Sequence, residues 1–139
     1  MKRTPLERKS PLRAKAPMNR KREKRSAPKR RTIDTRWRSP AYLAWVRTLP
    51  CCVCGASPCD AHHMVGMHGV GGMGLKAEDS MAMPLCRACH MELHREPGWL
   101  QHQPRWLRHT IALGMREFGG EIHEALREAL AFINEREAA

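Results

Sequence analysis

Cysteine and histidine residues are concentrated in one stretch of the chain. All six cysteines lie between positions 51 and 89, and five of the eight histidines lie between positions 62 and 94. Thiolates and neutral imidazoles are ligands that zinc and related divalent ions prefer. Six cysteines in a chain without an export signal are better explained as thiols or metal ligands than as disulfides. The composition therefore predicts metal binding and indicates where the metal lies.

The cysteines include two Cys-x-x-Cys pairs, which are Cys51 with Cys54 and Cys86 with Cys89. Four thiolates from two such pairs make a closed tetrahedral zinc site, which is structural rather than catalytic. The 31 residues between the pairs exceed the usual ribbon spacing, so a segment is inserted there. A redox role is less favoured, because no strand–helix–strand pattern surrounds the pairs. Cys52 and Cys59 are predicted to be ordinary small residues, although Cys52 could replace Cys51 if the turn shifted by one position.

The histidines form a second pattern. His62 and His63 are adjacent on a predicted strand over Ala61–Val65, where neighbouring side chains point to opposite faces and can take different tasks. His90 and His94 are four positions apart on a predicted helix, so they share one face and could bind one ion together. The other histidines are predicted to have no metal role; they are His68, His102, His109 and His123.

Several helices are expected to position these groups. Ser39 and Pro40 are typical of a helix start, and Pro50 prevents that helix from continuing. A second helix is expected from Cys86 to about Glu96. Two more are expected in the last forty residues, one from Pro104 to Gly119-Gly120 and one from about Glu121. A core of this size is marginal alone, so zinc is expected to contribute folding energy.

The positive charge is confined to the start of the chain. Residues 1–40 contain sixteen Lys and Arg and three acidic residues, whereas residues 41–139 contain nine and eleven. Few apolar residues and many like charges predict a disordered basic arm over residues 1–38. We expect it to contact DNA phosphates; a solubility tail or linker is the alternative. The expected organisation is this arm, a metal-binding core over 39–97 and a helical extension over 98–139.

No apolar run approaches the roughly 20 residues of a membrane span, so no membrane association is expected. The basic N-terminus also lacks the apolar stretch of a secretory signal. We therefore expect a cytoplasmic protein.

The combined pattern resembles the HNH, or ββα-metal, nucleases, and it is most similar to the phage Ref-type, RecA-dependent group. The resemblance covers roughly residues 39–110. The motifs that carry it are Ala61-His62-His63, the glycine-rich segment from Gly69 to Gly74 with Lys76 and Asp79, Pro84-Leu85-Cys86, and Cys89-His90 to Leu93-His94. The resemblance implies an α+β fold, with a small zinc-stapled ββα-metal core, flanking helices and the basic arm.

The resemblance also implies roles for individual residues. His63 would be the general base, and the ligands of a catalytic divalent ion would be His62, His90 and His94. The structural zinc ligands would be Cys51, Cys54, Cys86 and Cys89. The central Asn of HNH proteins is missing here, and Asp79 lies in that segment. Its carboxylate could hold the loop backbone, lean toward the metal or simply form a turn.

The function expected from these features is metal-dependent DNA hydrolysis. A neutral imidazole can take a proton from water near pH 7, and a divalent ion neutralises charge on the phosphate. Imidazole ligands suit Zn, Ni, Co or Mn better than Mg, but Mg²⁺ or Mn²⁺ is expected as the working ion. The resemblance implies a RecA-type recombinase filament as partner, a role in phage recombination, and the bacterial host cytoplasm as location if the chain is phage-encoded. The alternative is a non-catalytic zinc-stapled DNA-binding or adaptor module, which has no need of an unliganded imidazole such as His63.

Overall fold

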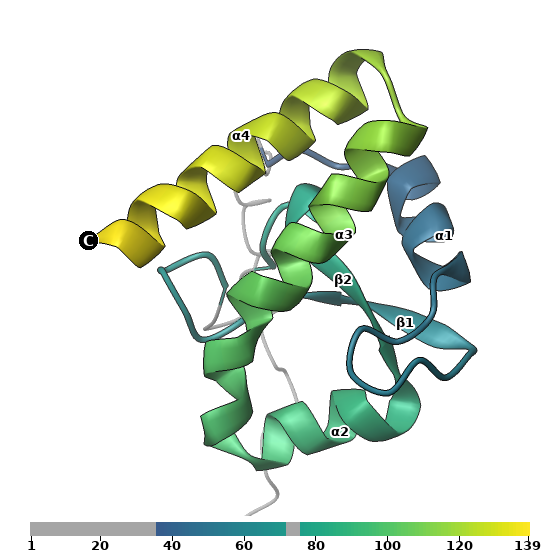
Figure 1. Cartoon of the computed structure of the whole chain (residues 1–139), viewed down its shortest axis with the longest axis vertical. Coiled ribbons are helices and arrows are strands. Elements are labelled where there is room, and N and C mark those ends of the chain that lie inside the picture. The colour runs from purple at the N-terminus through teal and green to yellow at the C-terminus, as the bar shows by residue number, and fades with distance from the viewer. Residues whose placement is uncertain (1–35, 72–75) are drawn as a thin grey trace, which may run out of the picture. The chain divides into compact units, whose positions relative to one another are not determined.

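A computed structural model of the protein describes residues 36–71 and 76–139 (Figure 1). The fold is α+β, as predicted, with a two-stranded sheet and several helices around it. The elements in chain order are α1 (Pro40–Thr48), β1 (Cys59–His63), the 3-10 helix η1 (Asp79–Met81), β2 (Ala82–Cys86), α2 (Arg87–Arg95), the 3-10 helix η2 (Pro97–His102), α3 (Gln103–Glu117) and α4 (Gly120–Ala138).

The sheet is an antiparallel pair of β1 and β2. Its register places Cys59 opposite Cys86 and His63 opposite Ala82. The strand expected at Ala61–Val65 therefore begins and ends two residues earlier than predicted. Pairing starts at Cys59 because its partner Cys86 is the last residue of β2, after which α2 begins.

Helix α1 begins where the sequence predicted. The Ser39 hydroxyl accepts a hydrogen bond from the backbone N–H of Tyr42 at 3.2 Å, and Pro40 occupies the first helical position. Such a cap satisfies one of the N–H groups that a helix start leaves without a partner. Tyr42 and Val46 are fully buried, so the helix packs its predicted apolar face into the core.

The predicted arm falls almost wholly on residues 1–35, which lie outside the described residues. The prediction includes residues 36–38 in that arm, but they belong to the same folded unit as the residues that follow them. The guanidinium of Arg38 donates hydrogen bonds to Ala77 O and Asp79 Oδ1, and Trp37 packs against the core. The folded unit thus begins a few residues before Ser39.

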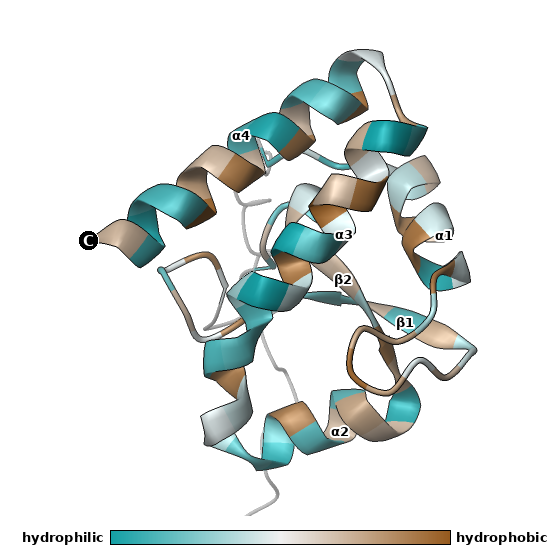
Figure 2. Cartoon of the chain, in the orientation of Figure 1, coloured by the Kyte–Doolittle hydropathy of each residue, from teal (hydrophilic) through white to brown (hydrophobic). Residues whose placement is uncertain are grey.

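Helices α3 and α4 complete the core. Helix α3 contacts β2, and α4 packs along α3 (Figure 1). Figure 2 shows hydrophobic and hydrophilic stretches alternating along both helices, as expected for helices with one buried face. The helices approach closely at Gly114, where an added Cβ would lie 2.8 Å from a methyl carbon of Leu126.

Within residues 36–71 and 76–139, no helix combines the length and the apolar character that a membrane span requires.

Candidate metal centres

The four predicted cysteines come together at one end of the hairpin. Their sulfur atoms all lie within 4.8 Å of one another, in the group Cys51, Cys54, Cys86 and Cys89. The first pair lies on a tight turn in which the Gly55 N–H donates to Cys51 O at 2.8 Å. Gly55 adopts φ +74°, which a residue with a Cβ rarely does. The Cys52 N–H donates to Pro84 O at 3.0 Å, and this bond fixes the turn beside β2.

The surroundings of Cys51 favour a thiolate. Burial alone would raise the pKa of this thiol, but three backbone N–H groups lower the pKa to about 6. These groups belong to Val53, Cys54 and Cys86. Burial and the neighbouring sulfurs, in contrast, raise the pKa of Cys89. Four sulfurs this close cannot all be thiolates without a compensating cation, because their negative charges repel.

The cysteine group therefore fits a divalent ion. Four sulfurs around a tetrahedral zinc, each about 2.3 Å from the ion, lie about 3.8 Å apart. The Cys54 and Cys86 sulfurs are 3.5 Å apart, which is far beyond the roughly 2.05 Å of a disulfide. Cys52 and Cys59 are not in the group; their thiols donate to Pro84 O and Ala56 O, respectively. The structure thus places Cys51, rather than Cys52, in the group that could hold a metal.

The three predicted histidine ligands form a second group. One ring nitrogen from each of His62, His90 and His94 lies within 4.8 Å of the others. The ring centroid of His62 is 4.7 Å from that of His90 and 5.5 Å from that of His94. Strand β1 supplies the first ring and one face of α2 supplies the other two, as their four-residue spacing predicted.

The histidine group also fits a metal ion chemically. His62 is only 3% exposed, and burial, followed by the nearby His90, lowers its pKa to about 4. The ring is therefore neutral at pH 7, which is the form that ligates a metal. Both groups could hold a metal ion.

Two of the three histidines in this group, His62 and His90, also contact a polar side chain outside the group. The Nε2 atom of His62 lies 3.3 Å from Oε1 of Gln103, a fully buried residue at the start of α3. The Nδ1 atom of His90 lies 3.1 Å from Oδ2 of Asp60. Neither partner was predicted, since nothing in the sequence links position 103 to position 62 or position 60 to position 90.

His63 points away from this group, as expected for consecutive residues of a strand. Its Nε2 lies 2.8 Å from Oδ1 of Asp79, and both residues are buried. Burial lowers the pKa of His63 despite the opposing effect of the Asp79 carboxylate, so the imidazole is neutral at pH 7. The contact is therefore a hydrogen bond from a neutral ring to a carboxylate.

Asp79 is held in place from the other side by the chain before α1. The backbone N–H of Ser39 donates to Oδ2 at 2.9 Å, and the Arg38 guanidinium lies 3.1 Å from Oδ1. Burial alone would raise the pKa of this carboxyl, but bonds from His63, Ser39 and Arg38 lower it. The Asp79 carboxylate thus contacts a backbone N–H, as one of the alternatives for this residue proposed, but that N–H belongs to Ser39 before α1; the contact with His63 was not predicted.

The remaining histidines lie outside the histidine group. His68 Nε2 is 2.9 Å from a carboxylate oxygen of Glu137, and this contact connects the loop after β1 to α4. The ring of His102 lies 5.8 Å from that of Trp106.

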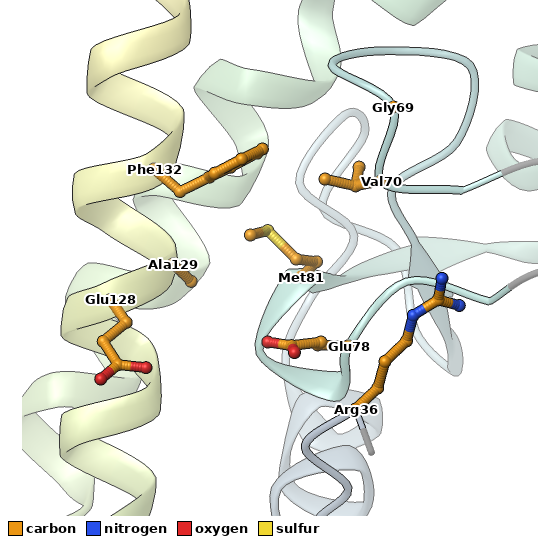
Figure 3. Close-up of a pocket in the computed structure, with 8 residues that line it drawn as sticks. All are labelled: Arg36, Gly69, Val70, Glu78, Met81, Glu128, Ala129 and Phe132. Carbon is orange, nitrogen blue, oxygen red and sulfur yellow. The ribbon is translucent and has the colours of Figure 1, made fainter. Parts of the chain in front are cut away.

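A pocket of about 410 Å³ lies between α4 and the segments around Val70 and Met81 (Figure 3). The eight residues that line it are Arg36, Gly69, Val70, Glu78, Met81, Glu128, Ala129 and Phe132. None of these residues belongs to either candidate metal group.

Comparison with known proteins gives a family without an assigned function. A protein of Escherichia coli (strain K12), named uncharacterized protein YdfU, is 51% identical over 69 residues. The match covers 50% of this chain and 18% of that protein, so the chain spans less than a fifth of the length of this relative. No solved structure matches. The family described as "Protein of unknown function (DUF968)" matches residues 25–104, a stretch that includes both candidate metal groups, Asp79 and Gln103. Because this match covers more than half of the chain, the chain belongs to the DUF968 family.

Proposed function

We propose that this protein is a metal-dependent DNA endonuclease of the ββα-metal type. One observation carries the proposal. A neutral, buried histidine held by a carboxylate, His63, directly follows a histidine of a three-imidazole group, His62. Neighbouring side chains of a strand point to opposite faces, so β1 can supply a metal ligand from one residue and a base from the next.

His63 is proposed as the general base. The Asp79 carboxylate only accepts hydrogen bonds, so Nε2 of His63 carries the proton and Nδ1 keeps its lone pair. A base at Nδ1 can take a proton from the attacking water, and Asp79 stabilises the imidazolium that forms. General-base catalysis of this kind contributes about 10²- to 10⁴-fold to a rate.

His62, His90 and His94 are proposed to hold the catalytic ion, Mg²⁺ or Mn²⁺. When bound, a divalent ion neutralises charge on the phosphate and on the leaving oxygen. The chain contributes three imidazoles, of which His62 is buried and so excludes water from one side of the site. The proposed structural zinc would be held by the cysteine group, which joins the turn before β1 to the start of α2.

DNA is the proposed substrate. Residues 1–40 carry a net charge of +13, which follows from sixteen basic and three acidic residues, and such a segment suits sequence-independent contact with phosphates. The resemblance to Ref-type nucleases adds a RecA-type filament, phage recombination and a bacterial cytoplasm as parts of the proposal. The alternative is a non-catalytic, zinc-stapled DNA-binding or adaptor module in which the histidine group is structural.

A plasmid assay separates these two functions. The zinc-loaded full chain is incubated with supercoiled plasmid and Mn²⁺ or Mg²⁺, with and without a recombinase filament on single-stranded DNA. An endonuclease converts the plasmid, or the filament-bound DNA, to nicked or cut product, and a chelator of the added ion stops the reaction. DNA binding without cleavage under every condition would support the adaptor module instead.

A further inference from the structure

The amide of Gln103 has a fixed orientation. Its Nε2 donates to Val65 O at 2.8 Å and to Leu100 O at 3.2 Å. Its Oε1 accepts from the backbone N–H of Val65 at 3.1 Å. Exchanging the amide O and N would place a donor against the Val65 N–H and an acceptor against two carbonyls. The neighbours therefore determine that Oε1, an acceptor, faces His62.

An acceptor at this position determines the tautomer of His62. Nε2 of the ring lies 3.3 Å from Oε1 of Gln103, so Nε2 must be the protonated nitrogen that donates. Nδ1 then keeps its lone pair. For His90 the arrangement is reversed, because Nδ1 faces the Asp60 carboxylate at 3.1 Å and must carry the proton. The lone pair of His90 is consequently on Nε2.

We propose that Gln103 and Asp60 are positioning residues that fix the two tautomers, so that one ion meets Nδ1 of His62 and Nε2 of His90. The inference rests on the proposed histidine metal site and deepens it. Polar partners behind ligating histidines orient the ring and set the tautomer, and losing such a partner weakens metal binding about 10- to 100-fold. Gln103 also connects the ligand on β1 to the start of α3, so docking of α3 helps to shape the site.

Long-range ¹H–¹⁵N spectra of the imidazole rings test the proposal directly. The sample is the zinc-loaded full chain at neutral pH without added Mn²⁺. We expect a proton on Nε2 of His62 and on Nδ1 of His90. Because a neutral imidazole in water favours the Nε2 proton, His90 is the stringent case. An Nδ1-protonated His62 or an Nε2-protonated His90 would overturn the assignment for that residue.

Mn²⁺ affinity, followed by the EPR signal of the free ion, provides the second test, because Mn²⁺ prefers the histidine group to thiolates. Asp60→Ala and Gln103→Leu should each weaken binding about 10- to 100-fold. Asp60→Glu, which keeps a carboxylate acceptor, should retain more of the affinity than Asp60→Ala. Glu92→Ala removes a carboxylate from α2, and Thr110→Val removes a buried polar group from α3. Both controls should bind Mn²⁺ as the wild type does.

These outcomes are independent of cleavage. If Gln103→Leu fails to fold, the Asp60→Ala variant and the wild-type spectra still decide the question. The Asp60 side chain is half exposed, so its replacement should not prevent folding. Unchanged Mn²⁺ affinity in folded Gln103→Leu and Asp60→Ala would overturn the proposal even if the protein cuts DNA. The expected tautomers and affinities in a chain that cuts no DNA would support the inference and count against the nuclease function alone.

Discussion

Nε2 of His63 lies 2.8 Å from Oδ1 of Asp79, although the two residues are sixteen positions apart in the chain. His63 ends β1, and Asp79 begins η1, which leads back into β2. The hairpin therefore brings a carboxylate to Nε2 of the imidazole. Asp79 is itself held by Ser39 and Arg38, so the start of the folded unit supports the same ring.

Replacing Asp79 should impair catalysis more than folding. In Asp79→Asn the amide N–H₂ can face Nε2 of His63 and donate to it. This favours the tautomer with the proton on Nδ1, which cannot act as the proposed base. We expect the cleavage rate to fall by up to the roughly 10²- to 10⁴-fold that a general base contributes. The free energy of unfolding should fall by about 1–3 kcal/mol, because buried hydrogen bonds are lost. Initial rates of plasmid nicking and thermal unfolding measure the two effects.

Glu78→Gln is the control, because it makes the same charge change at the adjacent position, which lines the pocket of Figure 3. Its nicking rate should equal that of the wild type. An Asp79→Asn protein that cleaves at the wild-type rate would remove Asp79 from the proposed mechanism.

The cysteine group should hold one zinc ion for each chain. Cys86→Ser removes one of four thiolates, and we expect this variant to lose its zinc and unfold at lower temperature, since metal binding and folding are coupled. Cys52→Ser is the matched control, because Cys52 lies outside the group and only donates to Pro84 O. Elemental analysis gives the zinc content. Equal zinc in both variants, or none in the wild type, would contradict the structural zinc site.

The local elements were largely predictable from the sequence. Ser39 and Pro40 mark the start of α1, and Pro97 follows the end of α2 at Arg95. The four-residue spacing of His90 and His94 requires only a helix to bring their rings together. Both candidate metal groups follow from residue types and spacings of this kind, and the structure gathers the seven predicted ligands into these two groups.

The hydrogen-bond partners of the site histidines were not predictable in this way. Gln103 resembles any polar residue at a helix start, and only the packing of α3 against the hairpin brings it to His62. Asp79 was considered as a support for the loop, but its contact with His63 depends on the hairpin register. The 3-10 helices η1 and η2 were missed, because such short turns have no periodic apolar pattern.

Folding stability should depend on pH through His62. Its pKa is lowered from 6.5 to about 4 in the folded chain, so between these values the unfolded chain binds more protons. The free energy of unfolding should therefore decrease as pH falls from about 6.5 to 4, by up to about 1.4 kcal/mol per pH unit. Zinc loss from the cysteines adds to this decrease. Urea unfolding at several pH values gives the free energy of unfolding of the wild type and of His62→Gln. Because both proteins keep the cysteines, the difference between their pH profiles isolates the effect of His62. Parallel profiles would contradict this prediction.

The basic arm should supply the salt-dependent part of DNA binding. Each phosphate contact by Lys or Arg contributes about −0.9 to the slope of log affinity against log salt on duplex DNA. Deleting residues 1–35 should weaken binding and flatten this slope, while zinc content stays unchanged. Binding titrations of both proteins at several salt concentrations provide the test. Identical slopes would mean that the arm is a solubility tail and that the folded unit makes the DNA contact.

The most direct test of the proposed nuclease is the nicking rate of His63→Ala at saturating Mn²⁺, on whichever DNA the wild type cuts. His123→Ala, a change on α4 outside both metal groups, is measured beside it. We predict that His63→Ala keeps its zinc and its DNA affinity but cuts about 10²- to 10⁴-fold more slowly, and that His123→Ala cuts at the wild-type rate. A folded, zinc-loaded His63→Ala protein that cuts at the wild-type rate would contradict the proposed mechanism.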